Sequence, residues 1–239
     1  MTSVLIIGGG GMIGQKLASS FSTNDSLTLL DIGFPNKNQS NARKIIGSVG
    51  DPEIIENSLK DLPEVIYYLA SVVSGEAEAD FSKGWDVNIH AFWAFLSLVK
   101  KLNEKSQGQY KPKIIFTSSI AVFGSPFPNQ IPDDFIAAPR TSYGAQKASC
   151  ELMLNDFSRK GFCEGLAIRL PTICVRPGKP NLAASSFFSG IIREPLSGIN
   201  AQLPVSTAVR HWHASPRSAV RFLRHAETLN FSQIGRAHV

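Results

Sequence analysis

The stretch SVLIIGGGGMIG, residues 3–14, decides the fold of this chain of 239 residues. Its first half is an apolar run typical of a buried strand, and its second half places glycine at positions 8, 11 and 14. Residues that lack a Cβ atom let the backbone turn tightly and approach a pyrophosphate, while the N–H groups at the start of the next helix point at the anion. The periodic segment 12–21 supplies that helix. The stretch therefore predicts a strand, a loop and a helix that together bind a dinucleotide.

A second apolar segment, residues 26–31, ends in Asp31. A carboxylate at this place accepts hydrogen bonds from both ribose hydroxyls of NAD and repels the 2′-phosphate of NADP. No arginine stands beside it to bind that phosphate. The order of strand, glycine loop, helix, strand and acid therefore predicts NAD as the cofactor. The alternative is a flexible turn followed by an ordinary surface aspartate.

Strand-like and helix-like segments alternate along the next part of the chain. Strands are expected at residues 44–49, 64–70, 113–119 and 165–170, and helices at 52–60, 81–104 and 143–160. Strands that are apolar throughout indicate a parallel sheet covered by helices on both faces. We therefore expect an α/β fold with a doubly wound parallel sheet of the Rossmann type.

The organisation of the chain changes after Leu170, where Pro, Gly and Ser become frequent. We expect residues 1–170 to form the NAD-binding domain with the catalytic residues, and residues 171–233 to form a smaller, truncated substrate lobe. The last six residues, 234–239, read IGRAHV, and the codons ATC GGA AGA GCA CAC GTC for this peptide resemble a common sequencing-adapter string. We expect them to be a non-native tail; the alternative is that the tail is genuine.

Composition excludes several classes of protein. Hydrophobic residues make up 43% of the chain and charged residues 18%, as in ordinary globular proteins. No apolar run reaches the roughly 20 residues of a membrane-spanning helix. No basic segment precedes the first apolar run, and the three cysteines form no CxxC pair. We therefore expect a cytoplasmic protein with reduced thiols, no secretory signal and no membrane contact.

The charged residues and the histidines restrict the classes of ligand that we expect this protein to bind. From Arg169 onward the chain carries nine Lys and Arg residues against two Asp and Glu, which suits an anionic ligand. These cations are scattered and are not interleaved with aromatic residues, so we expect no nucleic-acid partner. His211 and His213 lack a nearby Cys, Asp or Glu that would complete a metal site, so we expect no metal.

The segment SYGAQK, residues 142–147, places Tyr143 four residues before Lys147, on one face of a helix. A phenol has a pKa of about 10, too high for a base near neutrality, and a nearby ammonium lowers it. Ser119 ends the strand 113–119, at the edge where open parallel sheets bind ligands. The three side chains together predict a site that removes a proton from a substrate hydroxyl.

The GxxGxxG loop, the strand end TSSIAVFG and the SYGxxK segment resemble the extended branch of the short-chain dehydrogenase/reductase family. The resemblance implies a catalytic triad in which Tyr143 is the general base, Lys147 lowers its pKa and holds the nicotinamide ribose, and Ser119 orients the substrate. It also implies that Asn88 supports the active-site strands. The implied cofactor-binding residues are Gly8, Gly11, Met12, Ile13, Gly14, Asp31, Ser48, Val49, Leu69, Ala70, Tyr143, Lys147 and Pro171.

Four further blocks, residues 70–81, 169–181, 184–196 and 210–220, resemble the D-erythronate dehydrogenases of that family. This implies oxidation of the C2 hydroxyl of a small anionic sugar acid, D-erythronate to 2-oxo-erythronate, with NAD. A carboxylate substrate needs a cation, best a guanidinium. The available arginines are Arg140, Arg176, Arg193 and Arg210. The expected substrate-binding residues are Ser74, Ser119, Tyr143, Thr172, Arg176 and Arg193.

Two other functions stay open. A sugar-nucleotide epimerase or dehydratase of the same family would keep its NAD and form no net NADH. A non-catalytic NAD-binding regulator would not need the intact triad. The resemblance also implies a homodimer, joined by a four-helix contact in which each copy contributes segments 81–104 and 143–160. Phe92, Trp93 and Phe95 suit burial either in that contact or in the core.

Overall fold

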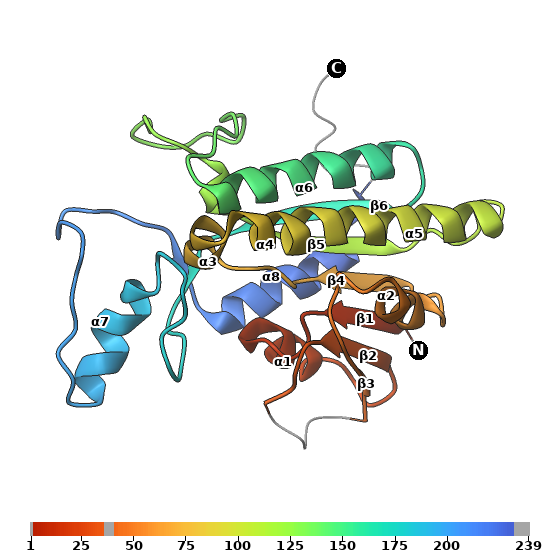
Figure 1. Ribbon diagram of the computed structural model, residues 1–239, viewed down its shortest axis with the longest axis horizontal. Coiled ribbons are helices and arrows are strands. Elements are labelled where there is room, and N and C mark those ends of the chain that lie inside the picture. The colour runs from red at the N-terminus through yellow and green to blue at the C-terminus, as the bar shows by residue number, and fades with distance from the viewer. Residues whose placement is uncertain (1, 36–40, 232–239) are drawn as a thin grey trace.

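The computed structural model describes residues 2–35 and 41–231, so the expected tail at 234–239 lies outside the described residues. Six parallel strands form one sheet in the order β3-β2-β1-β4-β5-β6 (Figure 1). They are β1 (Ser3–Ile7), β2 (Ser26–Asp31), β3 (Arg43–Ile46), β4 (Val65–Tyr68), β5 (Lys113–Ser119) and β6 (Glu164–Leu170). This is the strand order of the classical doubly wound dinucleotide-binding fold, which confirms the expected fold class.

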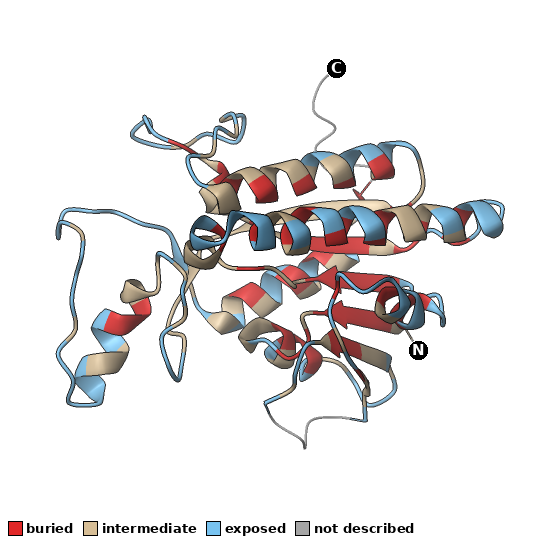
Figure 2. Cartoon of the chain, in the orientation of Figure 1, coloured by how far each residue is buried: buried red, intermediate tan, exposed pale blue. Residues whose placement is uncertain are grey.

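Helices cover both faces of this sheet (Figure 1). On one face lie α2 (Pro52–Leu59), α5 (Ala91–Lys105) and α6 (Ser142–Arg159), whose apolar side chains share one core cluster with β4 and β5. On the other face lie α1 (Met12–Ala18) and α8 (Pro216–Thr228), which share a second cluster with β1 and β4. The buried residues concentrate on the strands and on the inner sides of these helices (Figure 2).

The helix expected at residues 81–104 is interrupted. It consists of α4 (Phe81–Trp85), one π-helical turn over Asp86–His90, and α5. The π turn carries Asn88, whose side-chain oxygen accepts a hydrogen bond from the backbone N–H of Val72 at 2.8 Å. Its amide nitrogen donates to the Val72 carbonyl at 3.2 Å and to the side chain of Gln146 at 2.7 Å. The widened turn thus ties the loop after β4 to α6, which agrees with the supporting role implied for Asn88.

The C-terminal part is divided between the main sheet and a region outside it. Ala219, Leu223 and Ala226 of α8 are buried together with Val4 and Ile6 of β1, so residues 216–228 pack on the six-stranded sheet. Outside the sheet lie α7 (Phe187–Leu196) and a small second sheet of β7 (Thr172–Ile173) and β8 (His213–Ala214). In Figure 1, α7 stands apart from the main sheet.

A short helix, α3 (Ser74–Ala79), also follows β4, where no helix was expected. Its sequence SGEAEA is too short and too polar to show helical periodicity.

In the described part of the chain, none of the helices combines the length and the apolarity needed to cross a membrane.

The packing of α8 leads to a stability prediction. Leu223 is fully buried under the sheet, whereas its neighbour Phe222 is 47% exposed. We expect Leu223→Ala to lower the free energy of unfolding by about 3 kcal/mol, because it leaves a cavity between α8 and the sheet. Phe222→Ala should change it by about 0.5 kcal/mol or less. Urea unfolding of both variants makes the measurement, and equal effects would mean that α8 does not belong to this core.

Candidate active site

The glycine loop joins β1 to α1 and is shaped by close backbone contacts. Gly8 has a φ of +91°, and a Cβ atom there would lie 2.7 Å from the backbone nitrogen of Ala70. A Cβ atom at Gly14 would lie 2.1 Å from the carbonyl oxygen of Gly8. Gly11 is the N-cap of α1, so Met12 and Ile13 begin the helix at the loop. The backbone is thus bare where a pyrophosphate needs close approach, and these residues fit a bound dinucleotide.

The other expected cofactor residues lie along the same edge of the sheet. Asp31 ends β2, and its carboxylate accepts a hydrogen bond from the N–H of Gly10 at 2.8 Å. Ser48 and Val49 follow β3, Leu69 and Ala70 follow β4, and Pro171 follows β6. Because all six strands are parallel, these positions meet at the carboxyl ends of the strands, where doubly wound sheets bind ligands.

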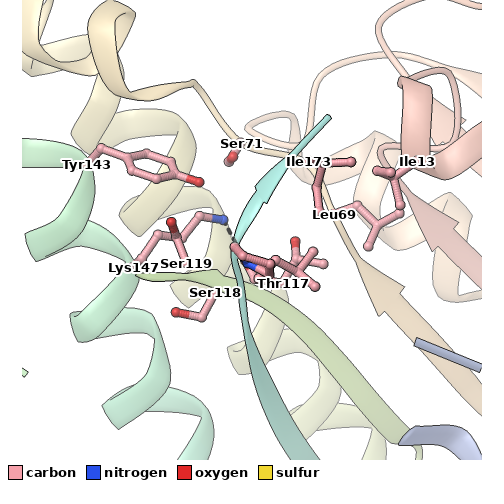
Figure 3. Close-up of a pocket in the computed structure, with 11 residues that line it drawn as sticks. Ile13, Leu69, Ser71, Thr117, Ser118, Ser119, Tyr143, Lys147 and Ile173 are labelled. Carbon is pink, nitrogen blue, oxygen red and sulfur yellow. Dashed lines mark hydrogen bonds between the residues drawn. The ribbon is translucent and has the colours of Figure 1, made fainter. Parts of the chain in front are cut away.

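Ser119, Tyr143 and Lys147 meet at a small cavity of about 200 Å³ (Figure 3). Ser119 ends β5, and Thr141 caps the start of α6 by accepting from the N–H of Gly144 at 3.1 Å, which places Tyr143 in the first turn. The wall opposite these side chains is apolar. The complete lining is Ile13, Leu69, Ser71, Thr117, Ser118, Ser119, Tyr143, Lys147, Leu170, Pro171 and Ile173.

Burial raises the pKa of Tyr143, and hydrogen bonds from Ser71 and Ser119 oppose this rise. Ser119 Oγ accepts from the backbone N–H of Ala121 at 3.1 Å, which leaves its own proton free for the phenol oxygen. The ammonium of Lys147 instead donates to the carbonyl of Thr117 at 2.9 Å and lies 5.6 Å from the centre of the Tyr143 ring. In this structure, therefore, the groups that lower the pKa of Tyr143 are two hydroxyls, and the expected effect of Lys147 is not among them.

Ser71 was not anticipated from the sequence, which pointed to Ser74. Both follow β4, but Ser71 lies in the loop and lines the small cavity, with the Tyr143 hydroxyl directed toward it (Figure 3). Ser74 begins α3, and its hydroxyl accepts from the backbone N–H of Ala184 at 2.9 Å. The sequence could have pointed to Ser71 through its position, because it lies three residues after the end of a parallel strand.

Lys147 is buried among apolar and polar side chains. Burial lowers the pKa of its ammonium to about 8, while Cys150 and Glu151 act in the opposite direction. Its charged group also lies 4.6 Å from the centre of the Phe116 ring. A lysine with a pKa near 8 is still mostly protonated at pH 7, so Lys147 is a buried ammonium at neutral pH.

A larger cavity of about 1120 Å³ shares Ser119, Tyr143, Pro171 and Ile173 with the small one. Hydroxyl and amide side chains line it: Ser74, Ser119, Asn129, Gln130, Thr141, Tyr143, Thr172 and Ser185. Among the described residues that line it, Arg210 is the only Lys, Arg, Asp or Glu. The expected substrate residues Ser74, Ser119, Tyr143 and Thr172 are therefore brought together here.

Arg176 and Arg193 are not among the residues lining this cavity. Arg193 donates to the backbone carbonyl of Arg176 at 2.9 Å and forms an ion pair with Glu194. Its guanidinium is thus already occupied within α7. Sequence spacing shows which cations are available but does not show which of them already have a partner.

The two histidines near Arg210 make packing and hydrogen-bond contacts. His211 shares a hydrogen bond of 2.7 Å with Thr172, and its ring stacks on Phe188 with 4.6 Å between ring centres. Burial, and then the neighbouring His213, lowers the pKa of His211. Among residues 2–35 and 41–231, no three His, Cys, Asp or Glu side chains gather in a way that would hold a metal ion.

A model of the NAD dependent epimerase/dehydratase family matches residues 4–214 of this chain. The protein belongs to this family. Its glycine loop, its strand-end serine and its tyrosine and lysine on α6 all lie within the matched residues.

Two curated relatives are named D-erythronate dehydrogenase. The one from Cupriavidus necator is 42% identical over 99% of this chain and 75% of its own length. The one from Haemophilus influenzae is 41% identical over 93% of this chain and 71% of its own length. A crystal structure described as a nucleoside-diphosphate-sugar epimerase, from Agrobacterium tumefaciens, is 46% identical, covers 98% of this chain and 71% of its own, and has a TM-score of 0.88.

The buried lysine of this family member leads to a prediction on stability and pH. The pKa of Lys147 is about 8 in the folded protein, against 10.5 for an ordinary lysine, so the fold favours the neutral form of this side chain. The resulting stability is fully present above pH 10.5, the pKa of the unfolded chain, and is lost as the pH falls through about 8. We expect Lys147→Met to raise the free energy of unfolding at pH 7 by about 2 kcal/mol, because it removes a buried charge.

The advantage of Lys147→Met over the wild type should shrink between pH 7 and pH 10, where the native lysine becomes neutral. Urea unfolding at both pH values makes the measurement. Lys160→Met, at the exposed end of α6, is the control and should show no such change. A pH-independent difference for Lys147→Met would contradict the lowered pKa.

Proposed function

We propose that this protein is an NAD-dependent dehydrogenase that oxidises the C2 hydroxyl of D-erythronate to 2-oxo-erythronate. The observation that carries the proposal is the meeting of Ser119, Tyr143 and Lys147 at one cavity beside the glycine loop, in a chain 42% identical to a D-erythronate dehydrogenase. A non-catalytic regulator would need neither the cavity nor the buried lysine, whose burial costs stability.

In the proposed site, Gly8, Gly11 and Gly14 cradle the pyrophosphate and Asp31 accepts from the adenosine ribose hydroxyls. Met12, Ile13, Ser48, Val49, Leu69, Ala70 and Pro171 complete the cofactor site. NAD, when bound there, supplies an acceptor for a hydride. The N–H that Gly10 now donates to Asp31 shows that this carboxylate faces the loop that would hold the dinucleotide.

The proposed proton transfer uses the chain's own residues. Ser119 donates a hydrogen bond to the C2 oxygen of the substrate, and Tyr143 as phenolate takes the proton of that hydroxyl while the C2 hydride leaves. The C–H and O–H bonds break and the C2 carbonyl forms. Ser71 stabilises the phenolate, because a hydrogen-bond donor favours the ionised form. The Lys147 ammonium donates to the Thr117 carbonyl, and its proposed role is to hold the nicotinamide ribose.

Arg210 is our candidate for the group that holds the substrate carboxylate, in place of Arg176 and Arg193. It lines the larger cavity. The next residue, His211, lines the same cavity and shares a hydrogen bond with Thr172. A guanidinium matches the planar geometry of a carboxylate with two parallel hydrogen bonds. The hydroxyls of Ser74, Thr172 and Ser185 supply partners for the remaining hydroxyls of a sugar acid.

A sugar-nucleotide epimerase is the second candidate function. Two observations favour it: the 46% identity to a structure described by that activity, and a cavity volume of about 1120 Å³, far more than a four-carbon acid fills. The charge of the cavity argues the other way. A nucleoside diphosphate carries at least two negative charges, and Arg210 is the one formal cation among the described lining residues.

A homodimer in the cytoplasm is part of the same proposal. Of the three neighbouring aromatic residues of α5, Phe92 and Phe95 are buried in the core, whereas Trp93 is 54% exposed. Leu152 of α6 is also exposed. These outward-facing apolar side chains support a contact between α5 and α6 of two copies. The three cysteines are free thiols, which suits a reducing compartment.

The reaction is tested by following NADH absorbance with NAD and a panel of four-carbon sugar acids. We expect NADH to form with D-erythronate and Tyr143→Phe to lower kcat by at least about 100-fold, because the base is lost. Fluorescence titration with NAD confirms that the variant still binds the cofactor. No NADH from any acid, with NAD binding intact and UDP- or dTDP-sugars raising the melting temperature, would establish the epimerase instead.

The carboxylate site is tested by comparing two arginines. We expect Arg210→Gln to raise KM for D-erythronate about 10- to 100-fold, since it removes a charge-assisted pair to the substrate, with a smaller change in kcat. Arg193→Gln should leave KM within about twofold, because that guanidinium is engaged by Glu194. The reverse result would assign the carboxylate to Arg193.

A further inference from the structure

Behind the small cavity, three polar side chains from three elements meet. Glu151 of α6 accepts a hydrogen bond from the hydroxyl of Ser118 on β5. Arg169 of β6 binds the same carboxylate through one edge of its guanidinium: Nε lies 3.0 Å and 3.2 Å from the two oxygens, and Nη2 lies 2.7 Å from Oε2. The side chain of Glu151 is only 14% exposed, so this carboxylate is held by two strands at once.

The cluster sits directly behind the proposed catalytic groups. Ser118 and Arg169 are paired in the register of β5 and β6, one residue before the strand ends Ser119 and Leu170, which line the small cavity. Glu151 follows Lys147 by four residues, so it lies one turn further along the same face of α6. Lys147 itself donates to Thr117, the residue before Ser118. One carboxylate therefore fixes α6 against the two strands that carry the site.

The cluster also reaches the wall of the larger cavity. The guanidinium of Arg169 lies over the ring of Phe123, 4.9 Å from its centre. Phe123 lines the larger cavity and packs edge-on against Trp212, with 6.3 Å between ring centres. By orienting Arg169, Glu151 thus also affects the position of Phe123 in the wall of the larger cavity.

We propose that Glu151 is a positioning residue that fixes the Lys147 ammonium and the end of β5 and holds a negative charge behind them. It touches neither cavity, so it acts through Lys147 and Ser118. Its catalytic consequence rests on the role proposed above for Lys147, whereas its effect on the lysine itself does not.

The charges around Lys147 decide the sign of this effect. On α6 the ionisable groups that face it are Tyr143, Cys150 and Glu151. From β5 it meets a carbonyl and the ring of Phe116, which do not titrate. From β6, Arg169 acts on it through Glu151. Burial disfavours the ammonium, and the Glu151 carboxylate opposes that effect and raises the pKa of Lys147.

A purely structural ion pair and a positioning residue differ in what two substitutions do. Glu151→Gln keeps an oxygen for Ser118 but removes the negative charge, so the pKa of Lys147 should fall. Arg169→Gln keeps a donor for Glu151 but removes the cation that neutralises it, so the pKa of Lys147 should rise. Both substitutions weaken the same ion pair, and a merely structural role would give them effects of the same kind.

The experiment measures the pKa of Lys147 directly, in the full chain labelled with ¹³C at the lysine Cε atoms. The resonance that disappears in Lys147→Met is the one followed by NMR across the pH range. We expect a downward shift of about one pH unit in Glu151→Gln and an upward shift in Arg169→Gln. Asp156→Asn is the matched control, because it removes a carboxylate and an exposed ion pair with Arg159 from the same helix, and it should leave the resonance unchanged.

Shifts in the same direction in both variants, or no shift in either, overturn the proposal. If Glu151→Gln does not fold, Arg169→Gln alone decides, and a pKa that fails to rise counts against it. In the dehydrogenase assay the alkaline limb of kcat should move in the same directions as the NMR values. Opposite NMR shifts without NADH formation would uphold the role of Glu151 and reject the proposed reaction.

Discussion

The close approach of the glycine loop to the end of β4 is the constraint on which the rest of the site depends. Gly8 takes a left-handed conformation with no room for a side chain between it and Ala70, and Gly14 has no room for a side chain beside the carbonyl oxygen of Gly8. This contact draws the first turn of α1 onto the centre of the sheet, where the strand order reverses. The loop that carries Ser71 begins at the same place, so the same packing contact fixes both the proposed dinucleotide cradle and the hydrogen-bond partner of Tyr143.

The strands of the central sheet were predictable because each one is marked by its own short stretch of sequence. Each strand is an apolar run of its own, and β2 and β5 have the bounds that the sequence indicates. The place of α8 was not predictable in this way. Its buried residues are Ala219, Leu223 and Ala226, separated by arginines, and their partners lie more than 200 residues earlier in β1. Only tertiary packing shows that such a polar helix covers a sheet face.

The residues of the candidate site likewise fall into those that sequence spacing predicts and those that depend on tertiary contacts. Tyr143, Lys147 and the strand-end Ser119 follow from spacing on one helix and one strand, and the structure brings them to one cavity. The choice between Ser71 and Ser74 depends on where a short helix begins, and the choice among arginines depends on which guanidinium already has a carboxylate. Arg193 has Glu194 beside it, a pairing that residue spacing does not reveal. Contacts made across the fold are therefore the part that the sequence leaves open.

The edge position of β6 has a consequence for motion. Strands β1 and β4, which hold the glycine loop, lie inside the sheet with a hydrogen-bonded neighbour on each side, whereas β6 is the last strand in its order and all seven of its residues are partly exposed. Edge strands generally open locally at lower free energy than central ones, so we expect faster amide hydrogen exchange in β6 than in β1 and β4. The proposed cofactor cradle is thus built on inner strands of the sheet, whereas the proposed substrate side begins at Pro171, directly after an edge strand.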